Sequence, residues 1–132
     1  MVELSQKEKK RFSVVARINS ANHAWRGIKI LLSACHNMWG HIFFSLVAVY
    51  LGFILEISSY EWIAIVFAIA LVVVTETLNT AIEIDMDLTS PDFHPYARDT
   101  KDVAAGGVLL AVVFAIIIGM IVFLPKIYPM LI

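Results

Sequence analysis

One face of a predicted helix in the middle of the chain gathers side chains that carry oxygen atoms. At about 100° per residue, these side chains fall within roughly 60° of one line. The group, called the carboxylate stripe below, consists of Glu76, Asn79, Thr80, Glu83 and Asp87, whereas Asp85 points away. Hard oxygen ligands suit Mg²⁺, which takes one or two protein carboxylates and completes its shell with substrate phosphates and water. A second carboxylate suits a general base that acts on an alcohol.

The depth of the carboxylate stripe decides what it can reach. If Trp62 marks the outer membrane boundary, Glu76 lies about 21 Å into a layer of about 30 Å, and Glu83 lies at its inner boundary. The stripe then leads from lipid to cytoplasm, where a lipid head group and a water-soluble cosubstrate can meet. An ionisable residue at the centre of a spanning helix raises the free energy of membrane insertion by about 2.5 to 3.5 kcal/mol, so it is expected to have a function or a partner. The alternative is a structural role, in which Glu76 and Asn79 only form hydrogen bonds across a helix interface and hold an oligomer together.

A second group of charges precedes the last apolar run of the chain. Residues 88–100 contain Pro91 and Pro95 and are predicted to form a turn-rich cytoplasmic loop. The charged group at the end of this segment is Arg98-Asp99-Thr100-Lys101-Asp102. Lys101 is placed by this prediction at a helix N-terminus, where unpaired N–H groups also favour a phosphate. The alternative is capping by Asp99 or Thr100, with a lysine that extends to water.

The elements that position these groups are predicted to be membrane-spanning helices. The chain of 132 residues is 60% hydrophobic, with a mean hydropathy of +0.81, far above an ordinary soluble protein. Residues 37–55, 62–82 and 103–124 are each long enough to cross about 30 Å of hydrocarbon. In lipid they must be helical, because no water satisfies open backbone groups. The predicted fold class is an all-α membrane protein with one domain over residues 1–132.

The distribution of basic residues predicts the orientation in the membrane. Seven of the ten Lys and Arg residues lie in the first 29 positions, and the link between the first two spans has none. The positive-inside rule therefore places the N-terminus in the cytoplasm and the C-terminus outside. Residues 1–16 are predicted to form a basic cytoplasmic tail. Residues 17–36 show helical apolar spacing, which indicates either an interfacial helix or a helix packed against spans of its own or a neighbouring chain.

Several other function classes are disfavoured by the sequence. It contains neither G-x-x-x-x-G-K-[ST] nor a glycine-rich kinase loop, so no soluble nucleotide-binding fold is expected. The four histidines lack zinc-like spacing, and ordinary polar roles are expected for them. Three spans without an inverted repeat argue against a transporter. No nucleic-acid partner is expected.

The stripe and the second charged group together resemble a known family signature. Glu76-Thr-Leu-Asn79-Thr-Ala-Ile-Glu83, then Asp87, then Lys101-Asp102 after thirteen intervening residues closely resemble the bacterial integral-membrane diacylglycerol kinase and undecaprenol kinase family. The resemblance covers about residues 17–124. It implies a homotrimer in the bacterial inner membrane, with active sites shared between subunits, that transfers the γ-phosphate of MgATP to a lipid alcohol. Diacylglycerol is the favoured acceptor and undecaprenol a close second.

The resemblance also implies roles for individual residues. Glu76 is expected to be the catalytic base and a metal ligand, Asn79 a catalytic polar support, and Glu83 a ligand of Mg²⁺. The residues expected on the ATP side are Arg17, His23, Asp87, Lys101 and Asp102.

This sequence departs from the family pattern at three positions. Cys35 stands where many members carry a Glu that joins Glu83 in metal binding, Trp39 stands for an Arg, and His23 stands for a common Tyr. A thiol is a poor Mg²⁺ ligand, so the site has one carboxylate fewer or recruits another, such as Asp85. The alternative reading is accordingly a non-catalytic homologue or a cation-binding helical assembly.

Overall fold

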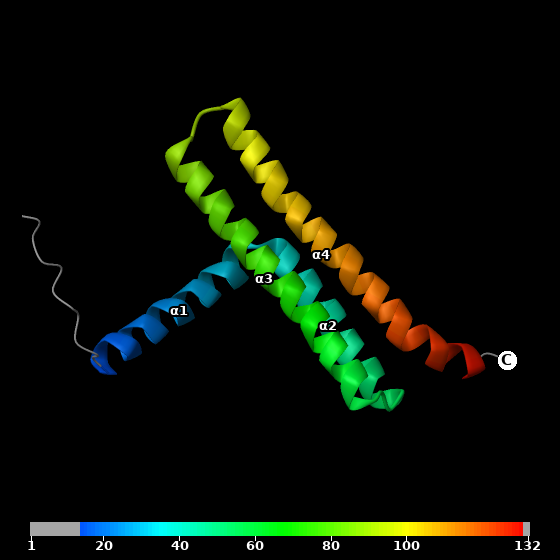
Figure 1. Ribbon diagram of the computed structural model, residues 1–132. Helices are drawn as coiled ribbons and strands as arrows, with labels where there is room; N and C mark the ends of the chain where they lie inside the picture. Colours follow the sequence, from blue (N-terminus) through cyan, green and yellow to red (C-terminus); the bar gives the residue numbers. More distant parts are fainter. Residues whose placement is uncertain (1–13, 131–132) are drawn as a thin grey trace, which may run out of the picture. The chain divides into compact units, whose positions relative to one another are not determined.

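The structure is a computed structural model that describes residues 14–130, and all regular elements in that range are helical. The helices are α1 (Val14–Ala34), α2 (His36–Ile54), α3 (Ser59–Thr89) and α4 (Pro95–Ile127), followed by the short 3₁₀ turn η1 (Tyr128–Met130) (Figure 1). The chain divides into two units, Met1–Ile30 and Leu31–Ile132. The second unit contains α2, α3 and α4.

The predicted all-α membrane class is confirmed. Helices α2, α3 and α4 are each long and apolar enough to cross a membrane. Large apolar side chains such as Phe44, Phe67 and Ile121 point outward from these helices, as hydrocarbon surroundings require. Helix α1 covers most of the predicted interfacial segment, 17–36, but its place at the interface and the homotrimer remain predictions. Most of the predicted tail, up to residue 13, lies outside the described residues.

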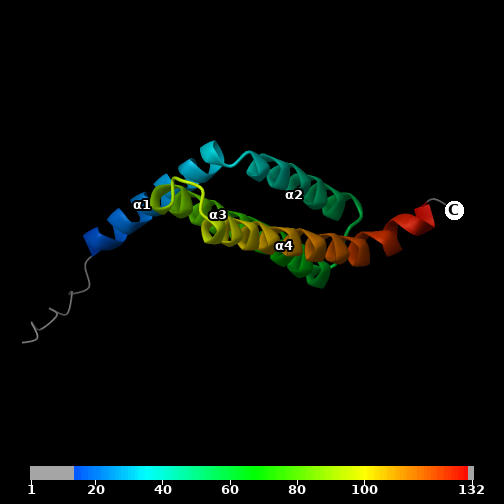
Figure 2. The same ribbon diagram turned by 90° about the horizontal axis from the view of Figure 1, so that it is seen from above.

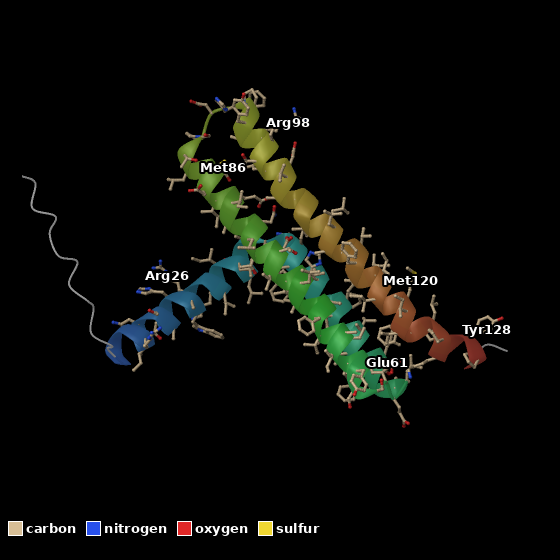
Figure 3. The ribbon with its side chains drawn as sticks, in the orientation of Figure 1. Arg26, Glu61, Met86, Arg98, Met120 and Tyr128 are labelled. Atoms are coloured by element: carbon tan, nitrogen blue, oxygen red, sulfur yellow. The ribbon has the colours of Figure 1, made fainter. Side chains whose placement is uncertain are left out.

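Helices α3 and α4 form an antiparallel hairpin that is longer than a bilayer is thick. With 31 and 33 residues, they measure about 46 and 50 Å at about 1.5 Å per residue. Both views show them side by side, with α2 alongside (Figure 1, Figure 2). The end that carries Met86 and Arg98 lies opposite the end that carries Glu61 (Figure 3). Because the hydrocarbon layer is about 30 Å thick, the charged end of the hairpin extends beyond it.

The connection between α3 and α4 is shorter than the predicted loop, 88–100. Only residues 90–94 are non-helical, and α4 begins at Pro95. Proline is tolerated there because its missing N–H would be unpaired in the first turn anyway. Lys101 therefore lies in the second turn, and its predicted place at a helix N-terminus is wrong. Capping by Thr100 is also wrong, since its hydroxyl donates to the carbonyl of Tyr96 within the helix at 2.8 Å.

At the opposite end, a capping box begins α3. The Ser58 hydroxyl accepts from the backbone N–H of Glu61 at 3.4 Å, and the Glu61 carboxylate accepts from the N–H of Ser58 at 2.6 Å. The same carboxylate lies 3.3 Å from Nζ of Lys126 on α4. These contacts join the start of α3 to the end of α4, next to a buried cluster formed by Ile57, Ile65, Val122 and Phe123.

Gly52 provides a test of the packing between α2 and α3. A Cβ built on Gly52 would lie 2.7 and 2.9 Å from two ring atoms of Trp62. We expect Gly52→Ala to lower the free energy of unfolding by about 1–3 kcal/mol, because the indole ring must move out of its packed position. Thermal unfolding in detergent micelles, followed by circular dichroism, measures the change.

Gly107→Ala is the matched control for Gly52→Ala. A Cβ at Gly107 meets nothing within 4 Å, so this change should be neutral or stabilise by up to about 1 kcal/mol through helix propensity. Equal midpoints for the two variants would show that the close approach of Gly52 and Trp62 does not constrain the packing.

Candidate functional site

The carboxylate stripe passes from a buried to an exposed environment along α3. Glu76 and Asn79 are 1% and 7% exposed, although both are polar and lie on a helix with a spanning composition. Glu83 and Asp87, one and two turns further on, are exposed. Within the second unit, the polar groups that are most costly to bury therefore lie at the buried end of the stripe, and its predicted course from lipid to cytoplasm stays a prediction.

The buried carboxylate of Glu76 has two neighbours before and within α2. The thiol of Cys35 donates to Oε1 of Glu76 at 2.8 Å. Nε2 of His41 lies 3.9 Å from Oε2 of the same carboxylate. The pKa of the Cys35 thiol is raised, mainly by burial and secondly by the hydrogen bond to Glu76, so the thiol stays protonated and acts as a donor. Both oxygen atoms of Glu76 thus face a specific side chain.

Among the remaining polar groups of the stripe, some already form hydrogen bonds within the described chain and one does not. The hydroxyl of Thr80 donates to the carbonyl of Glu76 at 3.0 Å, so this hydroxyl proton is not available to a ligand. The amide nitrogen of Asn79 donates to Oε1 of Glu83 at 3.3 Å. Oδ1 of Asn79 is buried and has no hydrogen-bond partner among the described residues. A buried acceptor of this kind costs about 1–3 kcal/mol unless a ligand or partner satisfies it.

The donor set of the stripe fits a hard cation incompletely. The carboxylates of Glu76 and Glu83 and the free Oδ1 of Asn79 are the oxygen ligands that Mg²⁺ prefers. Within residues 14–130, however, no group of three or more His, Cys, Asp and Glu side chains is gathered closely enough to hold a metal ion. Since Mg²⁺ usually completes its shell with phosphates and water, the set fits an ion that arrives with a nucleotide.

Three predicted nucleotide-side residues come together at the charged end of the hairpin. Lys101 on α4 forms an ion pair with Asp87 on α3. Arg98 and Asp102, one helical turn apart, pair at 3.6 Å between Nε and Oδ2. These four side chains border a hollow of about 280 Å³. The other residues that line it are Met86, Ser90, Pro91, Asp92, Phe93, His94 and Ala97.

Two other predicted ATP-side residues belong to the first unit. Arg17 and His23 both lie on α1 and both are exposed within the described chain. Their contribution to the site remains a prediction.

Sequence reasoning missed His41, which was expected to have only an ordinary polar role. Its contact with Glu76 joins residues 35 positions apart. A signal was present, because an ionisable ring within the first two turns of a spanning helix is unusual without a partner. The sequence alone did not identify that partner.

Comparison with known proteins identifies the family. Residues 22–123 match the family described as prokaryotic diacylglycerol kinase. The chain is 39% identical to the undecaprenol kinase of Bacillus subtilis (strain 168) over 104 residues, which cover 79% of this chain and 85% of that protein. It is 31% identical to a diacylglycerol kinase of Synechocystis over 114 residues, covering 86% and 65%, and 26% identical to the Escherichia coli (strain K12) diacylglycerol kinase over 102 residues, covering 76% and 82%. The predicted membrane lipid kinase family is confirmed, and the chain belongs to the prokaryotic diacylglycerol kinase family.

Proposed function

We propose that this chain transfers the terminal phosphoryl group of ATP to the hydroxyl of a membrane lipid alcohol. The observation that supports this most directly is that a buried Glu76 carboxylate and a buried Oδ1 of Asn79, which has no hydrogen-bond partner within residues 14–130, lie one helical turn apart on α3. The charged hollow with Lys101 at the far end of the same hairpin supports a water-soluble, anionic cosubstrate. The names of the relatives, undecaprenol kinase and diacylglycerol kinase, support a lipid acceptor.

In the proposed reaction, Glu76 acts as the general base. Its carboxylate takes the proton of the lipid hydroxyl, the lipid oxygen forms a bond to the γ-phosphorus, and the bond from that phosphorus to the bridging oxygen breaks, which releases ADP. A positioned base of this kind contributes about 10²–10⁴-fold to the rate. Cys35 and His41 orient the carboxylate, and Oδ1 of Asn79 is placed to accept a hydrogen bond from the incoming substrate.

Mg²⁺ would be held by the carboxylates of Glu83 and Glu76, and it would neutralise part of the negative charge of the phosphates. Asp87, Lys101 and Asp102 are proposed to hold the nucleotide, together with Arg17 and His23 from α1. Because the carboxylates of one chain make an incomplete metal shell, a neighbouring copy in a homotrimer is proposed to help complete the site. The N-terminus and the charged hairpin end are proposed to lie on the cytoplasmic side.

A direct assay of phosphoryl transfer tests this function. The purified full-length protein is given radiolabelled ATP with diacylglycerol or undecaprenol in mixed micelles, with Mg²⁺ present or chelated. Metal-dependent labelling of either lipid is the expected result. Labelling of neither would support the non-catalytic alternative, for which Cys35 in place of the usual Glu is the observation in favour.

Lys101 is predicted to act mainly in nucleotide binding. We expect Lys101→Gln to raise the KM for ATP about 10- to 100-fold, because a charge-assisted hydrogen bond to phosphate contributes about 1.5–3 kcal/mol. The kcat at saturating ATP should change less than the KM. Initial rates over a range of ATP concentrations separate the two parameters.

Lys126→Gln is the control for Lys101→Gln, since it removes a lysine from the opposite end of α4. It should leave the KM for ATP unchanged. A Lys101→Gln enzyme with normal KM but a much lower kcat would contradict the binding role and would assign Lys101 to transition-state stabilisation.

A further inference from the structure

The contact between Cys35 and Glu76 places a sulfur atom against a buried carboxylate. Sγ of Cys35 lies 2.8 Å from Oε1 of Glu76, although the two residues are 41 positions apart in the chain. Cys35 is partly exposed and stands between α1 and α2, whereas Glu76 is 1% exposed. A small cation can therefore reach the thiol from its exposed side and meets the carboxylate directly behind it.

This pair of ligand atoms has a preference among metal ions. Mg²⁺ prefers oxygen atoms throughout its shell, so it does not suit a position with sulfur on one side. Borderline-soft divalent cations, of the class of Zn²⁺ and Co²⁺, bind thiolates as well as carboxylates. In the hydrogen bond, a proton lies between Sγ and Oε1. A divalent cation that replaces this proton brings a positive charge to a buried carboxylate, where low polarity strengthens the attraction.

The observed distance requires only a small movement to admit such an ion. Zn–S bonds measure about 2.3 Å and Zn–O bonds about 2.0–2.2 Å, so sulfur and oxygen lie about 3.6 Å apart across a tetrahedral ion. The contact between Sγ and Oε1 must therefore open by about 0.8 Å. Cys35 has an extended backbone with φ −101°, so its side chain is not fixed by a surrounding helical turn.

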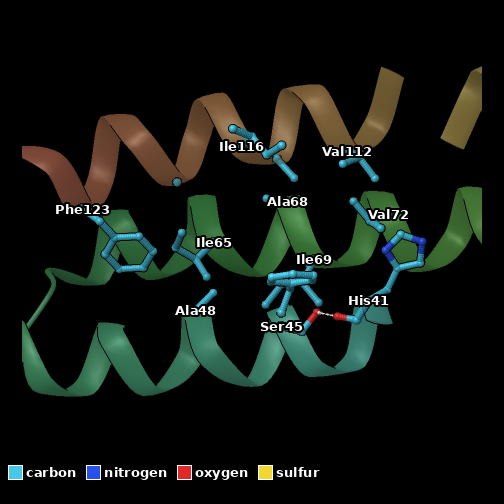
Figure 4. Close-up of a pocket in the computed structure, with 13 residues that line it drawn as sticks. His41, Ser45, Ala48, Ile65, Ala68, Ile69, Val72, Val112, Ile116 and Phe123 are labelled. Carbon is cyan, nitrogen blue, oxygen red and sulfur yellow. Dashed lines mark hydrogen bonds between the residues drawn. The ribbon is translucent and has the colours of Figure 1, made fainter. Parts of the chain in front are cut away.

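His41 lies at the other oxygen of the same carboxylate. Its ring extends from α2 toward α3, next to Val72 (Figure 4), and its Nε2 lies 3.9 Å from Oε2 of Glu76. At that distance it is not gathered with Cys35 and Glu76 into a set of three ligands within residues 14–130. His41 therefore orients the carboxylate from outside, as groups behind the ligands do in metal sites.

We propose that Cys35 and Glu76 form a binding site for a borderline-soft divalent cation, with Sγ and Oε1 as its protein ligands and water in the remaining positions. The thiol releases its proton to the solvent when the ion binds. The ion then occupies the carboxylate that the proposed reaction uses as its base, so it inhibits phosphoryl transfer. The site itself is independent of the proposed kinase function, and only the inhibition rests on that function.

Co²⁺ binding to the purified full-length protein tests the site directly. Cys35 is the only cysteine in the sequence, so a sulfur-to-cobalt charge-transfer absorption reports this residue alone. We expect the absorption to appear on titration with Co²⁺ and to disappear when Zn²⁺, which binds more tightly, displaces the cobalt. Cys35→Ser should lose the absorption. Glu76→Gln should weaken Co²⁺ binding about tenfold or more, because it removes the charged ligand.

His36→Gln is the matched control, because His36 is an exposed side chain with a ligand nitrogen next to Cys35 in the chain. It should keep the absorption and the Co²⁺ affinity. In the transfer assay with saturating MgATP, buffered free Zn²⁺ should inhibit the wild type and His36→Gln equally. Cys35→Ser should need about ten times more free Zn²⁺, or more, for the same inhibition. Thermal midpoints without added metal are recorded for every variant.

Three results would overturn the proposal. Absence of the charge-transfer absorption in the wild type would show that the thiol does not bind the ion. An unchanged Co²⁺ affinity in Glu76→Gln would show that the carboxylate is not a ligand. Equal inhibition of the wild type and Cys35→Ser would place the inhibitory Zn²⁺ at another position. Absence of transfer even without Zn²⁺ would instead reject the kinase function, and the absorption would still decide whether the metal site exists.

Discussion

Glu76→Gln is expected to reduce the rate of lipid phosphorylation by about 10²–10⁴-fold, the usual contribution of a general base. The amide cannot take the proton of the lipid hydroxyl. Its oxygen can still accept from the Cys35 thiol, which in the native chain lies 2.8 Å from Oε1, so the local packing should survive. The measurement is the single-turnover rate with saturating MgATP and lipid.

The design separates catalysis from assembly. Glu56→Gln, in the exposed turn before α3, is the control and should retain full activity. Oligomer size and thermal midpoint are recorded for both variants. If Glu76→Gln dissociates the oligomer, the carboxylate serves mainly as a polar contact between helices. If it keeps wild-type activity, another group is the base.

Cys35→Glu is expected to strengthen Mg²⁺ binding by about tenfold or more, which corresponds to about 1.4 kcal/mol. The Cys35 side chain already contacts the Glu76 carboxylate, so a glutamate there brings a second carboxylate to the same place. Two carboxylates in a buried site repel each other unless a cation lies between them. The variant should therefore be less stable than wild type with metal chelated, and should gain more stability and activity when Mg²⁺ is added.

Cys35→Gln is the control that separates charge from size. It has nearly the same shape as the glutamate but adds no charge, and it should show neither the stronger metal dependence nor the gain in rate. The measurements are activity against Mg²⁺ concentration and the thermal midpoint with and without the ion. An unchanged Mg²⁺ dependence in Cys35→Glu would mean that the metal shell is already complete.

The sequence by itself determined the class of fold and the identity of the stripe. A long apolar segment in lipid must satisfy its own backbone hydrogen bonds, which a helix does, so α2, α3 and α4 could be predicted from composition. The 3.6-residue period was enough to place Glu76, Asn79 and Glu83 on one face. The family signature was visible because its residues are close together in the chain.

Only the tertiary structure decided the rest, because it depends on which side chains meet across helices. Pro95 is compatible with a loop or with the first turn of a helix, so the true start of α4 and the position of Lys101 did not follow from residue type. The contacts of Glu76 with Cys35 and His41 join residues 41 and 35 positions apart. An apolar groove lined by residues of α2, α3 and α4, among them His41, Ile65 and Gly119, likewise arises only where the three helices pack.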